Sequence, residues 1–197
     1  MAIKILGVGS SMRDGSRGTL AIKIALDFAR KRGAQTRLLD LRQTKMSMYS
    51  PDGDESDDPQ IRKVEEDVNW ADAFILATPD YHGSMSGAMK NFLDYFWAEF
   101  AGKTFGYLCT SHEKGLTVME QMRTAVRQCY GWSLPYGVSI NPDEDFSSKG
   151  EITNSGLSLR IEMLARDLAV YGQIIHDQFL HDLSGNEAAT FAAHYRK

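Results

Sequence analysis

Short apolar runs alternate along the chain with longer segments of helical periodicity, and this alternation constrains the fold more than any other feature. The apolar runs cover residues 3–8, 36–41, 73–77, 104–109 and 136–140. Runs of this length and composition are typical of strands buried on both faces. The segments with helical periodicity cover residues 19–32, 60–70, 86–100, 116–128 and about 157–180, before a short C-terminal helix. Strands that alternate with helices predict a parallel sheet with helices on both faces.

The number and order of these elements narrow the fold class. They fit a flavodoxin-like α/β three-layer sandwich, whose five-stranded parallel sheet has the order 2-1-3-4-5. The chain has 197 residues and 43% hydrophobic content, enough for one large core, so we expect a single domain over residues 1–197. The acidic stretch 49–59 contains Gly and Pro and predicts a loop that is mobile.

Composition excludes several functional classes. The net charge is -4, and Lys and Arg are scattered, which argues against nucleic acid as a partner. There is no apolar run of about 18 residues and no signal-peptide pattern, so we expect no membrane association. The two cysteines, Cys109 and Cys129, match no disulfide framework or metal motif, and the histidines form no HExxH pattern. We therefore expect a cytoplasmic protein without a metal site.

The segment 9–16, Gly-Ser-Ser-Met-Arg-Asp-Gly-Ser, joins the first expected strand to the first helix. Its backbone N–H groups and the helix N-terminus suit a phosphate dianion. Arg13 can add bidentate, charge-assisted hydrogen bonds, and Ser11 and Ser16 can donate hydroxyl bonds. The loop therefore predicts a site for a terminal phosphomonoester. On residue types alone the alternative stays open that Ser16 is only an N-cap and Arg13 a solvated surface residue.

A dinucleotide-binding motif is a competing interpretation of the same loop. Gly7-Val8-Gly9 begins a GxGxxG pattern, and Asp40 lies where a ribose-binding acid would follow the second strand. However, Met12 occupies the third glycine position, where close helix–strand packing leaves no room for a side chain. We therefore disfavour NAD(P) as the resident ligand of this loop.

Two motifs resemble the NADPH-dependent FMN reductase family: GSSMRDGS near the N-terminus and TPDYHGSMSGAMKNFLDYFW from Thr78. The likeness extends over nearly the whole chain. The first motif is similar to the family's GSxRxxS, which implies that Ser11, Arg13 and Ser16 hold the phosphate of FMN. Ser10 stands where the family often has glycine.

The second motif is similar to the family's PEYNxSxPGxLKNxxDW. It maps onto Pro79, Asp80, Tyr81, His82, Ser84, Gly87, Lys90, Asn91 and Asp94. The resemblance implies that its first part lines the isoalloxazine and ribityl site. In this chain Asp80 replaces Glu, His82 replaces Asn, Ser86 replaces Pro and Tyr95 replaces Trp.

The second motif also makes physical sense for a flavin. It follows the third expected strand, at the point where the winding of the sheet reverses and ligands bind. Backbone groups of Asp80–Gly83 can meet the pyrimidine edge of the ring, Gly83 permits close approach, and Tyr81 supplies an aromatic wall. The alternative for Tyr81 and His82 is a packed loop with a polar tip.

The loop after the fourth expected strand, residues 110–115, departs from the glycine-rich stretch that relatives carry beside the flavin ring. Its contact with the ring is therefore open. Ser111 and Lys114 are candidate site residues, and Lys114 could stabilise negative charge on a reduced flavin. A surface lysine near a helix start is the alternative.

The resemblance implies an NAD(P)H-dependent flavin oxidoreductase. FMN would take hydride from NADPH or NADH and pass electrons to a small-molecule acceptor, namely a flavin, quinone, azo compound or metal. Because the flavin supplies this chemistry, we predict no catalytic acid, base or nucleophile. The alternatives are a flavodoxin-like carrier without a nicotinamide site, which Arg13 argues against, a domain that has lost its flavin, and a receiver domain, which would need acids that segment 9–12 lacks.

We also expect a homodimer or homotetramer, because relatives are oligomers. Apolar side chains of the expected helix 86–100 cover a wide arc of a helical wheel, which favours a subunit contact. They are Phe92, Leu93, Tyr95, Phe96, Trp97 and Phe100. The alternative is a helix sunk between its neighbours.

Overall fold

The computed structural model describes residues 2–53 and 58–196, and part of the expected acidic loop 49–59 lies outside them. The strands are β1 Lys4–Gly9, β2 Gln35–Asp40, β3 Ala73–Pro79, β4 Thr104–Thr110, β5 Trp132–Ser133 and β6 Val138–Ile140. The helices are α1 Arg17–Lys31, α2 Pro59–Trp70, α3 Gly87–Asp94, α4 Leu116–Gln128 and α5 Ser155–Ser184, with short 3₁₀ helices η1 Ala98–Phe100 and η2 Phe191–Tyr195.

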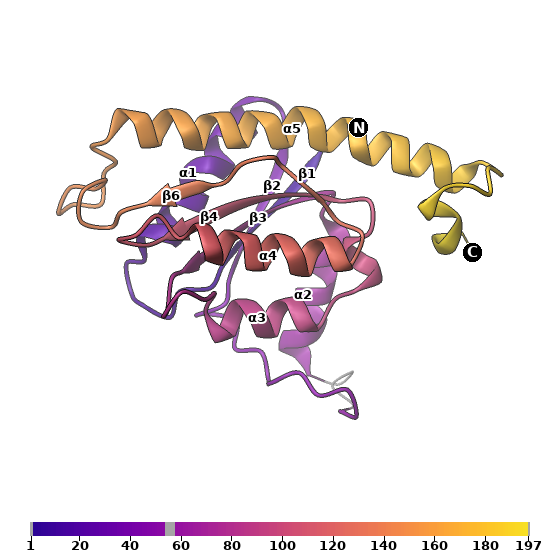
Figure 1. Ribbon diagram of the computed structural model, residues 1–197, viewed down its shortest axis with the longest axis horizontal. Coiled ribbons are helices and arrows are strands. Elements are labelled where there is room, and N and C mark those ends of the chain that lie inside the picture. Colours follow the sequence, from indigo (N-terminus) through magenta and orange to yellow (C-terminus); the bar gives the residue numbers. More distant parts are fainter. Residues whose placement is uncertain (1, 54–57, 197) are drawn as a thin grey trace.

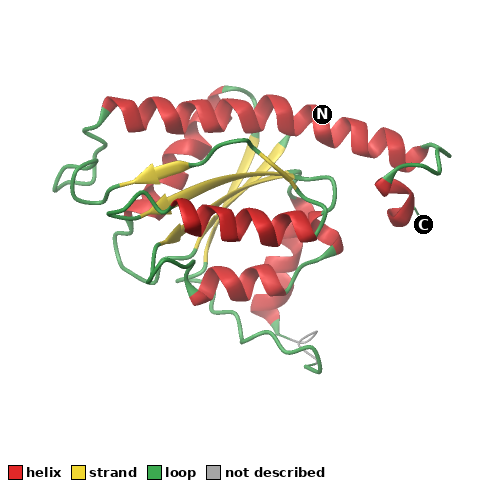
Figure 2. Ribbon diagram, viewed as in Figure 1, coloured by secondary structure: helices red, strands yellow, loops and turns green. Residues whose placement is uncertain are grey.

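All strands pair in parallel in the order β2-β1-β3-β4-β5, and β6 also pairs with β4. Helices α1 and α5 cover one face of the sheet, and α2, α3 and α4 cover the other (Figures 1 and 2). Successive strand side chains enter opposite layers: Ile5 and Ile75 pack with α1 and α5, whereas Leu6 and Leu76 pack with the other helices. The predicted fold class and strand order are confirmed.

The strand expected over residues 136–140 differs from the observed one. Its position in the sheet is shared by two short pieces, because β5 pairs with the start of β4 and β6 with its end. Pro135 lies between the two pieces. Proline has no N–H to donate, so the ladder is interrupted there.

The helix expected over residues 86–100 is also wrong in extent, because α3 ends at Asp94 and the chain turns into η1. Phe92, Phe96 and Phe100 are buried, and the turn folds them into an aromatic cluster around Phe74 and Phe105, whose rings stack at 4.6 Å. Leu93 is buried as well, Tyr95 is half-buried, and Trp97 is 68% exposed. Most of these apolar side chains fill the core and only Trp97 is largely exposed, so they give little support to a subunit contact, and the homo-oligomer stays a prediction.

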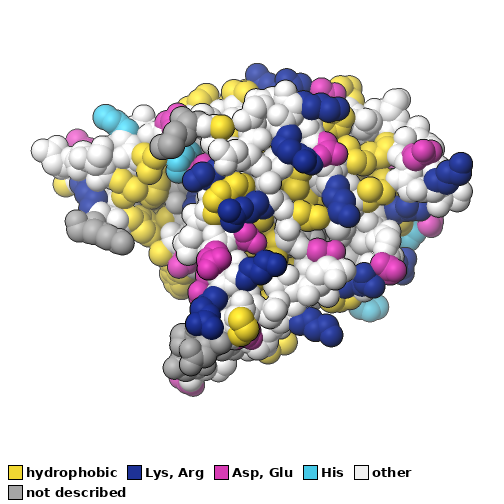
Figure 3. Space-filling model, turned by 180° about the vertical axis from the view of Figure 1, so that it is seen from behind, with side chains coloured by type: hydrophobic (Ala, Val, Ile, Leu, Met, Phe, Trp, Pro, Cys, Tyr) yellow, Lys and Arg dark blue, Asp and Glu magenta, His cyan; other side chains and the backbone are white. Residues whose placement is uncertain are grey.

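Surface charges of both signs are mixed. On the face seen in Figure 3, Lys and Arg side chains alternate with Asp and Glu and form no continuous patch. Among the described helices, none combines the length and apolar content that crossing a bilayer requires.

Lys103, the residue before β4, gives a pH-dependent prediction. Burial lowers its pKa from 10.5 to about 8, an effect that the charges of Asp72 and Glu99 partly offset, while Nζ donates to the carbonyl of Val68 at 2.8 Å. At a pH between these two pKa values, Lys103 is protonated in the unfolded chain and largely deprotonated in the folded protein, so the unfolded chain binds more protons. The free energy of unfolding should therefore rise between pH 8 and pH 10.5, by about 3 kcal/mol in total.

The measurement is urea unfolding at pH 7 to 9.5. Lys103→Met should remove this part of the pH slope, so its stability relative to wild type should fall as pH rises. Lys23→Met, on the exposed side of α1, is the matched control and should keep the wild-type slope. Equal slopes for wild type and Lys103→Met would contradict the prediction.

Candidate cofactor site

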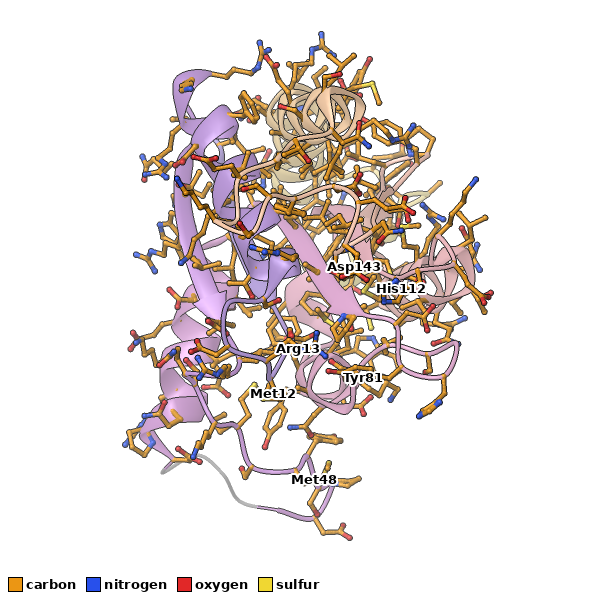
Figure 4. The ribbon with its side chains drawn as sticks, turned by 90° about the vertical axis from the view of Figure 1, so that its left-hand side faces the viewer. Met12, Arg13, Met48, Tyr81, His112 and Asp143 are labelled. Carbon is orange, nitrogen blue, oxygen red and sulfur yellow. The ribbon has the colours of Figure 1, made fainter. Side chains whose placement is uncertain are left out.

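The loops after β1, β3, β4 and β6 border an open cavity of about 1150 Å³. All the site residues predicted from sequence line it except Lys114: Ser11, Arg13, Ser16, Pro79, Asp80, Tyr81, His82, Gly83 and Ser111. Figure 4 views this end of the molecule, with Arg13 near Tyr81 and His112 near Asp143. The cavity lies beyond the carboxyl ends of the strands, where open parallel sheets bind their ligands.

The first loop presents an unpaired cation. Within the described residues the Arg13 guanidinium has no hydrogen-bond or carboxylate partner, whereas Asp14 is paired with Arg42 at 2.9 Å. The Ser16 hydroxyl accepts from the N–H of Thr19 at 3.3 Å and so caps α1, yet it also lines the cavity. Both roles considered for Ser16 therefore fit one position. The loop therefore places a guanidinium and hydroxyls beside a helix N-terminus, an arrangement that suits the binding of an anion.

The second loop is a tight two-residue turn. The backbones of Tyr81 and Ser84 bond each other in both directions, at 2.9 and 3.2 Å, and the central residues His82 and Gly83 have φ of 58° and 75°. Positive φ at both central positions is the pattern of a type I′ turn, which favours Asn-Gly. Histidine, like asparagine, enters this region more readily than most residues, so His82 suits the turn.

Substitution at His82 tests the turn. His82→Asn should change the free energy of unfolding by about 0.5 kcal/mol or less, while His82→Val should lower it by about 1–2 kcal/mol because a β-branched side chain resists positive φ. Urea unfolding of the two variants measures the difference. Equal stability of both variants would contradict the turn assignment.

The second and third loops are joined through Asp80. One carboxylate oxygen accepts from the N–H of Gly83 at 2.8 Å, and the other accepts from the Ser111 hydroxyl at 2.9 Å. Burial, reinforced by the negative charge of Asp80, raises the pKa of the nearby Cys109 thiol to about 12. Cys109 therefore stays protonated and is no nucleophile at neutral pH.

Lys114 is not among the residues that line the cavity. Both Lys114 and Gly115 have left-handed backbones, with φ of 68° and 57°, as the chain turns into α4. The lining passes from Glu113 to Gly115 and omits the lysine between them. The structure therefore gives no support to Lys114 as a site residue.

Sequence reasoning missed residues that hold the loops from a distance. Gln121 of α4 accepts from the Ser84 hydroxyl at 2.9 Å and from the N–H of Met85 at 3.3 Å, and it donates to the carbonyl of Gly83 at 3.1 Å. Nothing in the local sequence marks a glutamine on an amphipathic helix for this role. Only its position beside the second loop reveals it.

The segment after β6 forms a further wall that the sequence did not indicate. Pro142, Asp143 and Ser148 line the cavity. Arg17 fastens this segment to α1 by donating to the carbonyl of Ser147 at 3.1 Å, with its guanidinium 5.3 Å from the centre of the Phe146 ring. Asp143 lies 3.7 Å from His112 of the third loop, both side chains being exposed.

The strand order and the position of the cavity define a flavodoxin-like fold. A flavodoxin of Streptococcus pneumoniae superposes with a TM-score of 0.59 at 17% identity, over 85% of this chain and 99% of that one. The NAD(P)H:(acceptor) oxidoreductase FerB of Paracoccus denitrificans superposes with a TM-score of 0.70 at 16% identity, over 88% of this chain and 98% of that one. The chain belongs to the NADPH-dependent FMN reductase family, whose family model matches residues 3–145.

Named relatives agree with this family. An NADPH azoreductase of a Bacillus species is 30% identical over 53% of this chain, and an NAD(P)H-dependent FMN reductase of Pseudomonas aeruginosa is 32% identical over 55% of it. In both cases the match spans 60% of the relative's own length.

Proposed function

We propose that the cavity binds FMN and that the protein is an NAD(P)H-dependent flavin oxidoreductase. One observation carries the proposal: the Arg13 guanidinium, which has no partner in the described part of the chain, lies with the Ser11 and Ser16 hydroxyls at the N-terminus of α1, in a cavity shared with the Pro79–Gly83 loop. This combination suits a ligand with a phosphate at one end and a planar polar ring at the other. Family membership supports the same cofactor.

Different residues would bind the two ends of the cofactor. Ser11, Arg13 and Ser16 would hold the phosphate, and the turn Tyr81–Ser84, stiffened by Asp80 and Gln121, would meet the ring. Tyr81 is 49% exposed and free to form an aromatic wall. When bound, FMN supplies a ring that accepts hydride. The protein's part is to orient that ring and to shape the space beside it.

The remaining part of the cavity suits the other reactants. Besides the first two loops, the cavity is lined by Pro142, Asp143 and Ser148 of the segment after β6 and by His112 of the third loop, next to Asp143. We propose that NADPH or NADH and then a small-molecule acceptor bind here in turn. The relatives' names include azoreductases and FMN reductases, which supports an azo compound or a flavin as the acceptor.

Visible absorption spectroscopy tests this proposal. Purified protein mixed with FMN and freed of excess should keep a flavin spectrum, and NADPH or NADH added under anaerobic conditions should bleach it. Binding without bleaching would favour an electron carrier. Absence of any bound flavin would overturn the proposal.

A further inference from the structure

Three buried hydroxyls lie between the two loops proposed to bind FMN. Ser10, near the start of the phosphate loop 9–16, is 0% exposed; Thr78 and Ser86, at the two ends of the second loop, are 2% and 4% exposed. Polar side chains this deeply buried need partners within the protein. Each of the three has them.

The second loop is closed at its base by two of these residues. The N–H of Ser86 donates to Thr78 Oγ1 at 2.9 Å, and Thr78 Oγ1 donates to the carbonyl of Pro79 at 3.1 Å. Ser86 Oγ also accepts from the N–H of Met89 at 3.2 Å, which caps α3. The ends of the loop and the start of α3 are therefore tied together.

Ser10 extends this network into the phosphate loop. Ser86 Oγ donates to Ser10 Oγ at 2.8 Å and also lies 3.2 Å from the backbone carbonyl oxygen of Ser10, a second acceptor for the same hydroxyl. Ser10 Oγ donates to the carbonyl of Ala77 in β3 at 3.1 Å. The backbone N–H of Ser10 donates to the same carbonyl at 3.0 Å. A continuous chain of hydrogen bonds thus runs from the phosphate loop to the second loop.

Such a chain of fully satisfied, buried hydrogen bonds is stiff, because each bond is strengthened in a low-dielectric interior and costly to leave unmade. We propose that Ser10 and Ser86 are positioning residues, whose hydrogen bond fixes the spacing between the phosphate loop and the ring loop. This inference rests on the proposed binding of FMN. It assigns the two residues no contact with the ligand.

A fixed spacing matters only to a ligand that reaches both loops. When the spacing of the two loops is fixed, the phosphate and the ring of FMN can bind at the same time without further adjustment of the loops. The affinity for FMN is then higher than the affinities for its two ends would give separately. Riboflavin and inorganic phosphate each contact one loop, so their affinities do not depend on the spacing between the loops. The ligand's length therefore distinguishes positioning from a general loss of structure.

The test measures dissociation constants for FMN, riboflavin and inorganic phosphate. Ser10→Ala, which leaves the α3 cap intact, should raise the FMN constant about three- to tenfold, and the constants for riboflavin and phosphate should stay within about twofold of wild type. Ser86→Ala, which also removes the contact to the Ser10 carbonyl and the cap of α3, should raise the FMN constant at least as much as Ser10→Ala does. The double variant should bind FMN no more weakly than Ser86→Ala alone, because Ser86→Ala already removes the whole Ser86–Ser10 link. Ser133→Ala in β5 is the matched control: it removes a 2.7 Å hydroxyl–hydroxyl hydrogen bond to Tyr107 of β4 and should leave all three constants unchanged.

A second measurement uses the unaltered protein, in case the variants do not fold. Inorganic phosphate alone should slow hydrogen exchange at the Ser86 amide, although the phosphate site lies in the other loop. Unchanged exchange, unchanged FMN affinity in folded variants, or equal losses for FMN and riboflavin would overturn this inference alone. Failure of the wild-type protein to bind FMN would overturn it together with the proposed function.

Discussion

Replacing Arg13 by alanine should raise the dissociation constant for FMN about 10- to 100-fold and change that for riboflavin by about twofold or less. The guanidinium is unpaired within the described residues and lines the cavity beside Ser11 and Ser16. A charge-assisted hydrogen bond to phosphate is stronger than a neutral one. Riboflavin has no phosphate, so its binding does not include this bond and should not depend on Arg13. Quenching of flavin fluorescence on binding measures both constants.

Two further variants sharpen this result. Arg13→Lys should give an intermediate loss, because lysine keeps the charge but not the bidentate geometry. Arg127→Ala, which removes an exposed arginine from the last turn of α4, should leave FMN binding unchanged. Equal losses for FMN and riboflavin in Arg13→Ala would contradict a phosphate contact.

Gly115→Ala should lower the free energy of unfolding by about 2–4 kcal/mol. Gly115 precedes α4 in the left-handed region, with φ of 57° and ψ of 31°. An added Cβ would lie 2.3 Å from Cys109 Sγ and 3.0 Å from Cys109 Cβ, both in the buried end of β4. The substitution therefore combines backbone strain with a clash that a packed interior relieves only by shifting the third loop.

Gly33→Ala is the matched control, because Gly33 also has positive φ, 89°, but nothing lies within 4 Å of the added Cβ. It should cost about 1 kcal/mol, the strain alone. Urea unfolding of both variants gives the difference that belongs to the clash. Similar losses for the two glycines would show that the third loop yields without cost.

Sequence alone determined the layers, the strand order and two of the loops that border the cavity. Strands buried on both faces must be continuously apolar, and the helices that cover them must be amphipathic. The local sequence of each element is therefore enough to predict its type. In the loop Gly9–Ser16 the hydroxyls and the guanidinium are neighbours in sequence, so the sequence could predict that they share one site, and Ser11, Arg13 and Ser16 all line the cavity. Local signals were weaker at element ends: Pro135 divides the last strand position, and α3 ends at Asp94 although the apolar pattern continues.

The tertiary structure alone decided how the loops are held and which side chains meet. Gln121 reaches Ser84 across 37 positions of sequence, Ser86 reaches Ser10 across 76, and Arg17 reaches Ser147 across 130. Lys114, predicted because its charge could stabilise a reduced flavin, falls outside the cavity lining where the chain turns into α4. The physical reason is that a hydrogen bond needs atoms about 3 Å apart. No local pattern specifies such a distance until the sheet has brought its loops to one edge.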